Sequence, residues 1–282
     1  MPLKPALSFQ DQLNLLKRKK LVIKDDRLAL GYLAENNYYH LNKYFHEFLD
    51  ASGDFIIGTD FDEIITINEN DKFLRNLIFR LIDPIEIKLK TVIANYLSLK
   101  YGSRCFYDNS FSRDKKLWAN NFIKMMQDVF RDPTHPVVAW HIENYEAEFP
   151  LWVLMEFVTF GSVSSYFANL NVGDKNAIGS IHYQGVPGDK LESWFRSLGL
   201  IRNRCAHGGH LFRQKLTSLP KPPNFIPTTL LGSYPLFLIF CVIRELSKES
   251  DWASARTDLA TRESVTPFLI DYGFPSAWEK YI

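Results

Sequence analysis

The longest hydrophobic repeat in the chain runs over residues 70–99, and its spacing is that of an α-helix. Apolar or aromatic side chains recur there at steps of three and four residues, which places them on one helix face: Leu74, Ile78, Leu81, Ile85, Leu89, Val92 and Tyr96. The run Asp83-Pro84-Ile85-Glu86 interrupts this face. An acid, then proline, then glutamate three positions after the acid is typical of a new helix start. We therefore expect a break or a clear kink at Pro84.

Helical patterns also cover most of the remaining chain, and we find no internal repeat and no low-complexity segment. Residues 220–227 contain four prolines, which exclude a helix there. The pattern therefore predicts an all-α protein. The further helices are expected near residues 9–16, 26–35, 38–50, 117–130, 137–148, 150–162, 189–207 and 230–248.

Composition limits the classes of protein to which the chain can belong. Hydrophobic residues make up 46% and aromatic residues 15% of the 282 residues, enough for a substantial core in one or two domains. The formal net charge of +1 shows no polybasic character, so RNA would be bound through a local patch. Three scattered cysteines indicate a reducing compartment. We expect a cytoplasmic, soluble protein without a membrane partner, since residues 1–10 lack an apolar signal and residues 236–243 are too short to span a bilayer.

A cation and a titratable imidazole lie near the end of a predicted amphipathic helix that Asp189 is expected to cap. Apolar side chains recur along its face up to Cys205, and the pair Gly208-Gly209 is a typical helix stop. Arg202 and His207 therefore lie in the last turns, where the helix dipole favours a cation. Five residues separate them by roughly 140° around an ideal helix. Both could reach one anion if the helix loosens at the glycines.

The run Arg202-Asn203-Arg204-Cys205-Ala206-His207 resembles the R-x4-6-H motif of the HEPN superfamily. Followed by Leu211-Phe212, it is similar to the motif of the Abi (abortive-infection) family, of the AbiF/AbiD-like kind. Other segments that resemble this family are residues 37–44, 71–75, 85–88, 150–162 and 273–278.

This resemblance implies a fold and a domain organisation. We expect a single Abi-like domain over residues 1–282, built as a HEPN-type helical bundle. The bundle core would span about residues 70–248, with a helical N-terminal extension over residues 1–66 and a C-terminal helix.

The resemblance also implies a bacterial anti-phage protein that acts as a metal-independent endoribonuclease, a toxin that cleaves RNA in abortive infection. Arg202 would bind the scissile phosphate, His207 would perform acid–base catalysis, and Asn203 would orient the pair. An imidazole suits this task near neutral pH, and a guanidinium matches a phosphate. Two copies of the motif would face each other across a homodimer. No metal, no cofactor and no DNA partner is expected.

Several other interpretations stay open. Arg202 and His207 could merely cap their helix. The same surface could belong to a non-catalytic RNA-binding module that holds a regulatory small RNA, or to a nucleotide-binding regulator. Cys205, His207 and His210 would need a fourth ligand to bind zinc, so we do not expect a zinc site. The chain contains no glycine-rich phosphate loop and no H-E-x-x-H motif.

Other polar residues are candidates for supporting roles. Arg204, His210 and Arg213 are candidate RNA contacts, although Gly208-Gly209-His210 and Arg213-Gln214 depart from the Abi family's pattern. Glu156 either pairs with a cation such as Arg202 or stays exposed at the rim, and Glu86 is expected to form a surface salt bridge with Lys90. One basic run is either a solvated helix end or a phosphate-binding patch: Lys17, Arg18, Lys19 and Lys20.

Overall fold

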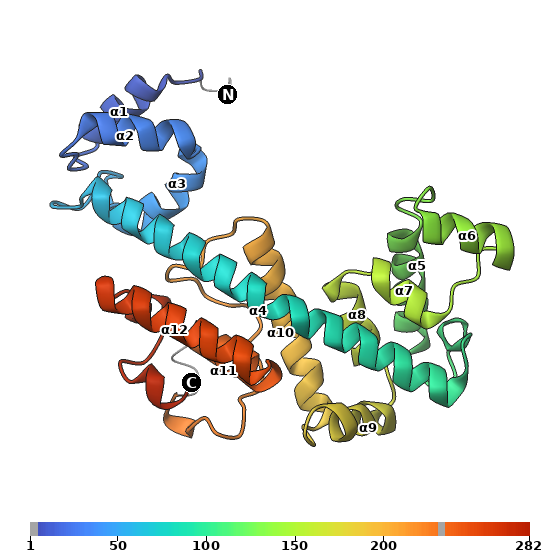
Figure 1. Ribbon diagram of the computed structural model, residues 1–282. Helices are drawn as coiled ribbons and strands as arrows, with labels where there is room; N and C mark the ends of the chain where they lie inside the picture. Colours follow the sequence, from blue (N-terminus) through green and yellow to red (C-terminus); the bar gives the residue numbers. More distant parts are fainter. Residues whose placement is uncertain (1–4, 231–234) are drawn as a thin grey trace. The chain divides into compact units, whose positions relative to one another are not determined.

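The computed structural model describes residues 5–230 and 235–282 and is built from α-helices (Figure 1). Within these ranges the chain forms twelve α-helices and no strand, apart from isolated bridges. The all-α prediction is therefore confirmed. The helices are α1 Phe9–Arg18, α2 Asp26–Glu35, α3 Tyr38–Phe45, α4 Phe61–Tyr101, α5 Lys115–Val129, α6 Pro136–Tyr145, α7 Leu151–Phe157, α8 Phe160–Ala168, α9 Val172–His182, α10 Gly188–Ala206, α11 Pro235–Leu246 and α12 Glu249–Val265.

The longest helix, α4, passes through Pro84 without a break. It extends over 41 residues with the proline inside it, so the expected break is wrong, and a kink at Pro84 stays a prediction. Proline lacks the N–H that would bond to the carbonyl of Arg80, which costs about 3 kcal/mol in a helix interior. Leu81, Ile82 and Ile85 on either side of it are at most 2% exposed. Burial of the apolar face on both sides of Pro84 offsets the lost hydrogen bond.

The predicted caps of α1 and α2 are confirmed, and that of α10 is not. Ser8 and Asp25 cap α1 and α2 through side-chain oxygens that accept backbone N–H bonds. The residue before α10 is Pro187, which cannot cap it with a side-chain hydrogen bond, so the predicted capping by Asp189 is wrong. Asp189 lies in the first turn, where its carboxylate accepts from the Lys221 amine.

Two helices of the structure were not predicted from the sequence, and one predicted helix corresponds to two separate helices. The predicted helix over residues 150–162 is two helices, because Thr159 accepts the N–H of Ser162 and starts α8. Helix α9 was not predicted, since its short sequence is interrupted by glycines at positions 173 and 179. Helix α12 was also missed, because few of its side chains are apolar. The expected helix over residues 230–248 corresponds to α11, and residues 231–234 lie outside the described residues.

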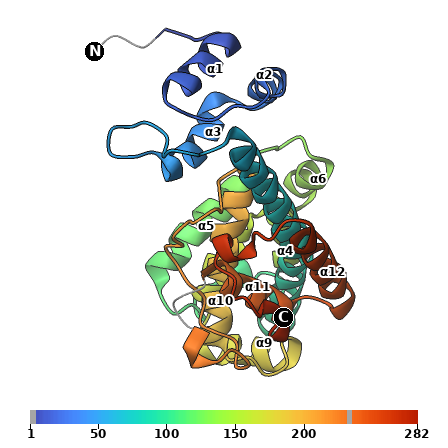
Figure 2. The ribbon, with the colours of Figure 1, turned by 90° about the vertical axis from the view of Figure 1, so that its left-hand side faces the viewer.

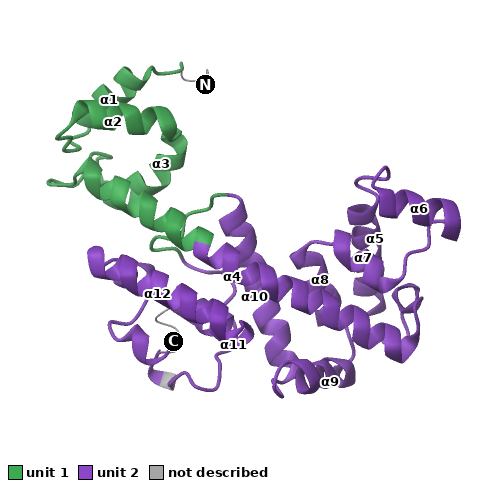
Figure 3. Cartoon of the chain, viewed as in Figure 1, with its two compact units in different colours: residues 1–76, 208–214 green, residues 77–207, 215–282 purple. Residues whose placement is uncertain are grey.

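The chain divides into two compact units (Figure 3). One unit comprises residues 1–76 and 208–214, and the other comprises residues 77–207 and 215–282. In the second unit α10 packs against α8, α9 and α11. Helix α12 lies beside the middle of α4 in Figures 1 and 2, where Arg80 donates to Asp258. The predicted division into an N-terminal extension and a HEPN core stays a prediction.

The first unit holds a buried ionic cluster around Asp71, which is completely inaccessible to solvent. Its carboxylate accepts from the Tyr44 hydroxyl at 2.7 Å and from the Arg75 guanidinium at 2.6 Å. It also accepts the backbone N–H groups of Leu211 and Phe212 at 3.0 Å. A buried carboxylate is tolerated only when its oxygens are satisfied in this way. Asp71 therefore holds the segment that follows the paired glycines.

Replacing this carboxylate should destabilise the protein strongly. We predict that Asp71→Asn lowers the free energy of unfolding by about 3–5 kcal/mol, because it leaves Arg75 as a buried charge without its counter-ion. Urea denaturation followed by circular dichroism measures the change. The matched control is Asp26→Asn, which removes an exposed pair with Lys17 and should cost less than about 1 kcal/mol. Equal losses in the two variants would contradict this role of Asp71.

Candidate functional site

The last two turns of α10 carry the predicted catalytic residues. The Arg202 side chain is 30% exposed, and its Nε lies 3.6 Å from Oε2 of Glu86. Its guanidinium lies over the Phe79 ring at 5.3 Å from the centroid, and Nη1 lies 3.4 Å from Oδ1 of Asn203. One carboxylate and one ring thus fix the direction of Arg202 and leave part of its guanidinium accessible to solvent.

Glu86 belongs to this site through its contact with Arg202, which was not predicted from the sequence. It forms the expected pair with Lys90 at 2.8 Å, but Glu86 is only 8% exposed. The expected surface bridge is therefore a largely buried one. The pair with Lys90 is local and readable from spacing, whereas the contact with Arg202 depends on how α10 packs beside α4. The only sequence signal for a role of Glu86 at this site was its place in a segment that resembles the Abi family.

His207 is the C-terminal capping residue of α10. Its backbone N–H donates to the Asn203 carbonyl at 3.1 Å, and Gly208 follows with φ of +65°. The predicted helix stop at the glycines is therefore confirmed. The side chains of His207 and Asn203 are both exposed, and no described residue bonds to the imidazole. Both ring nitrogens of His207 can therefore contact a ligand.

Arg202 and His207 leave the helix in different directions. Helix α10 stays helical through Ala206, so the expected loosening begins only after His207. Five residues of regular helix place the two side chains about 140° apart. Arg202 is directed towards α4, and His207 extends from the end of the helix. The two groups of one chain are both accessible, but their own helix does not place them on one face.

The accessory RNA-binding candidates lie in different parts of the molecule. Arg204 is half-buried on α10, in the same unit as Arg202. His210 and Arg213 belong to the other unit, where His210 lies 5.9 Å from the Tyr44 ring and Arg213 lies over the Phe212 ring at 4.7 Å.

The basic run at the end of α1 is mostly engaged in local contacts. Lys17 pairs with Asp26 at 2.6 Å, Lys20 pairs with Asp54 at 2.8 Å, and Lys19 donates to the Gly53 carbonyl at 3.2 Å. Arg18 is exposed. These contacts favour the interpretation of a solvated helix end over that of a phosphate-binding patch. All four residues of the run belong to the first unit: Lys17, Arg18, Lys19 and Lys20.

Glu156 takes the simpler of its two alternatives, a carboxylate exposed at the rim. The Glu156 side chain is exposed, and the ion pair of Arg202 is made with Glu86 instead. Cys205 is buried and does not take part in a disulfide. Across the described ranges, no group of three or more histidine, cysteine or acidic side chains is placed to hold a metal ion.

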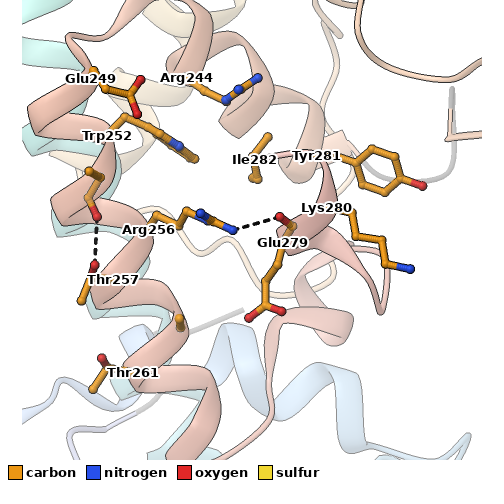
Figure 4. Close-up of a pocket in the computed structure, with 12 residues that line it drawn as sticks. Arg244, Glu249, Trp252, Arg256, Thr257, Thr261, Glu279, Lys280, Tyr281 and Ile282 are labelled. Carbon is orange, nitrogen blue, oxygen red and sulfur yellow. Dashed lines mark hydrogen bonds between the residues drawn. The ribbon is translucent and has the colours of Figure 1, made fainter.

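Two cavities of the second unit lie away from these residues. A polar cavity of about 520 Å³ lies between α12 and the C-terminal segment, where Arg256 donates to the backbone carbonyl of Glu279 at 3.1 Å (Figure 4). A second cavity of about 500 Å³ is lined by aromatic side chains that include Trp140 and Trp152. Neither cavity is lined by Arg202 or His207.

The comparison with known protein families places most of the chain in one family. The family model of Abi-like proteins matches residues 31–213, more than half of the chain. The chain belongs to the Abi-like protein family. The match includes Asp71, Glu86 and the run from Arg202 to His207. Membership of the Abi-like family indicates a role in abortive infection, a form of defence against phage. No curated protein and no solved structure matches the chain.

Among the helices of residues 5–230 and 235–282, none combines the length and the apolar character needed to cross a bilayer.

The half-buried Lys43 beside the glycine pair provides a test of the contacts in the first unit. Nζ of Lys43 donates to the carbonyl of Gly208 at 2.6 Å. The pKa of Lys43 is lowered from 10.5 to about 8, mainly because the amine is partly buried and also because of the nearby charge of Arg75, while Asp71 opposes the shift. Burial also lowers the pKa of the neighbouring His40.

The lowered pKa of Lys43 predicts a dependence of stability on pH. Between pH 8 and 10.5 the unfolded chain holds a proton on Lys43 that the folded chain has released. Stability therefore rises with pH in this window. We expect the free energy of unfolding of the wild type to increase relative to that of Lys43→Met as the pH rises from 8 to 10.5, and to stay constant below pH 8. Urea titrations at several pH values measure this difference. A difference that does not change across the window would contradict the assignment.

Proposed function

We propose that this Abi-like protein is a metal-independent endoribonuclease that acts as a toxin in abortive infection. The observation that supports the proposal is the exposed imidazole of His207, which has no protein partner in the described residues and ends the helix that carries Arg202. An exposed imidazole can exchange protons with a substrate near neutral pH. A guanidinium held by Glu86 can offer its remaining N–H groups to a phosphate.

The proposed reaction needs only groups that the chain and the RNA supply. His207 removes the proton from a ribose 2′-hydroxyl, and the 2′-oxygen attacks the adjacent phosphorus. The bond from phosphorus to the 5′-oxygen breaks, and that oxygen takes up a proton. The products are a 2′,3′-cyclic phosphate and a 5′-hydroxyl end. The Arg202 guanidinium stabilises the additional negative charge on the phosphate, and Asn203 orients the Arg202 side chain.

A homodimer would supply what one motif lacks. One chain offers a single histidine in this site, and its Arg202 leaves α10 about 140° from His207. A second copy with its own α10 end nearby would bring another imidazole to protonate the leaving oxygen. We propose that the two motifs face each other across such a dimer, with RNA between them.

A second candidate function is favoured by the pairing of Arg202. Its contact with Glu86 offsets part of its charge, and such an arrangement suits binding as well as catalysis. The chain would then be a non-catalytic RNA-binding module that holds a regulatory small RNA. This candidate predicts that RNA copurifies with the protein and stays intact.

Cleavage of RNA in the presence of EDTA tests the leading proposal. We expect wild-type protein to cleave RNA and leave 2′,3′-cyclic phosphate ends, and His207→Ala to be at least about 100-fold slower, the usual contribution of a general acid or base. The matched control is His182→Ala, at the end of α9, which should cleave at the wild-type rate.

The outcomes separate the two functions. Equal cleavage by wild type and His207→Ala would remove His207 from catalysis. Bound RNA that is not cleaved by the wild type, and is retained by His207→Ala, would contradict the nuclease and favour the RNA-binding module.

A further inference from the structure

A small cavity beside the end of α10 has a polar lining that the proposed mechanism does not use. It measures about 100 Å³ and lies wholly within the second unit. Ser197 and Arg204 line it from α10, and Thr217 and Ser218 line it from the segment that precedes α11. The remaining wall is apolar and includes Ile239. No acidic side chain lines this cavity.

Two polar atoms of this lining lack hydrogen-bond partners. Oγ of Ser197 and Nη1 of Arg204 are both buried, and neither bonds to any described residue. Ser197 is only 2% exposed, so bulk solvent does not reach its hydroxyl. Leaving a buried donor without an acceptor costs about 1–3 kcal/mol, and more for a charged group. Native proteins rarely leave such groups unpaired, and a bound ion or water is a common explanation.

We infer that this cavity binds the phosphoryl group of an anionic ligand. A guanidinium and a buried hydroxyl are suitable donors to phosphate oxygens, and the hydroxyls of Thr217 and Ser218 add further donors. The apolar part of the wall strengthens the attraction between the Arg204 cation and an anion. A cavity of about 100 Å³ accepts a phosphoryl group but not a nucleoside. The exposed side chain of Thr217 marks the side that is open to solvent.

The direction of Arg204 connects this cavity with His207. On a regular helix Ser197 and Arg204 lie about 20° apart, and His207 lies about 60° from Arg204. Arg202 lies on the other side of α10, towards Glu86. Arg204 is therefore the guanidinium on the His207 side of this helix. If the proposed nuclease function holds, on which this step rests, the cavity holds an RNA phosphate next to the one that is cleaved.

Titration of the full chain with inorganic phosphate tests the cavity directly. Isothermal calorimetry and thermal unfolding are measured at constant ionic strength, with sodium chloride replaced stepwise by sodium phosphate. We expect saturable binding by the wild type and an affinity at least tenfold lower for Arg204→Gln and Ser197→Ala. The matched control is Arg196→Gln, which removes an exposed arginine from the same helix and should bind phosphate like the wild type.

The stability of Ser197→Ala without phosphate provides a second readout. A hydroxyl without a partner contributes nothing to the folded state, so its removal should leave the melting temperature in chloride unchanged or higher. A lower melting temperature in chloride would show that Ser197 already has a water partner, which would overturn the inference. Equal stabilisation of all four proteins by phosphate would reflect general exclusion of the salt from protein surfaces, and would also overturn it.

A cleavage-resistant RNA distinguishes the source of the phosphoryl group. We expect a 2′-O-methyl oligonucleotide, which lacks the attacking hydroxyl, to bind Arg204→Gln at least tenfold more weakly than Arg196→Gln in fluorescence anisotropy. If both variants bind it equally while Arg204→Gln has lost phosphate binding, the cavity serves a free phosphate or a small phosphorylated ligand, and its role in RNA binding is overturned.

The experiments distinguish an error in the proposed anion site from an error in the proposed nuclease function. Saturable phosphate binding that requires Arg204, in a protein that does not cleave RNA, would support the anion site and contradict the nuclease. Cleavage that requires His207, together with unchanged phosphate binding by Arg204→Gln, would overturn the anion site and leave the nuclease intact.

Discussion

The proposed site depends on the ion pairs that the largely buried carboxylate of Glu86 forms. A carboxylate removed from water requires cations or hydrogen-bond donors around it, and Glu86 obtains them from Lys90 on its own helix and from Arg202 on α10. Because α4 and α10 meet at this group, the direction of Arg202 is set by the packing of the second unit. Two cations share one carboxylate, which leaves a net positive charge and an affinity for anions at the end of α10.

A second buried carboxylate organises the chain immediately after the motif. Asp71 collects the backbone N–H groups of Leu211 and Phe212, and Lys43 donates to the carbonyl of Gly208. These contacts belong to the first unit, whereas Arg202 and His207 belong to the second. The match to the Abi-like family spans both carboxylates. Two of the segments that resembled this family in the sequence, residues 71–75 and 85–88, carry these two carboxylates.

The sequence predicted the elements whose signals are local. The helical face of α4, the caps of the first two helices and the glycine stop after His207 each depend on a few neighbouring residues, and each was confirmed. The break at Pro84 was wrong because burial on both sides of the proline outweighed its local preference. Helix α12 was missed because its apolar residues are few.

The site was predictable only in part, for the same reason. Arg202, Asn203 and His207 follow from a motif within six residues, and the described structure places all three where solvent reaches them. The contact of Glu86 with Arg202 joins distant segments and could not be read from spacing. The unpaired atoms of Ser197 and Arg204 depend on the three-dimensional packing around them, which spacing along a helix does not specify.

A double-mutant cycle on RNA cleavage tests the central claim that Glu86 acts by positioning Arg202. The rates of wild type, Glu86→Gln, Arg202→Gln and the double variant are compared, with Lys90→Gln as a control that disturbs the same carboxylate but keeps its contact with Arg202. We expect both single variants to be slow and the double variant to be no slower than Arg202→Gln, because Glu86 would act only through Arg202. A double variant whose loss equals the product of the two single losses, or a Glu86→Gln variant that cleaves at the wild-type rate, would contradict it.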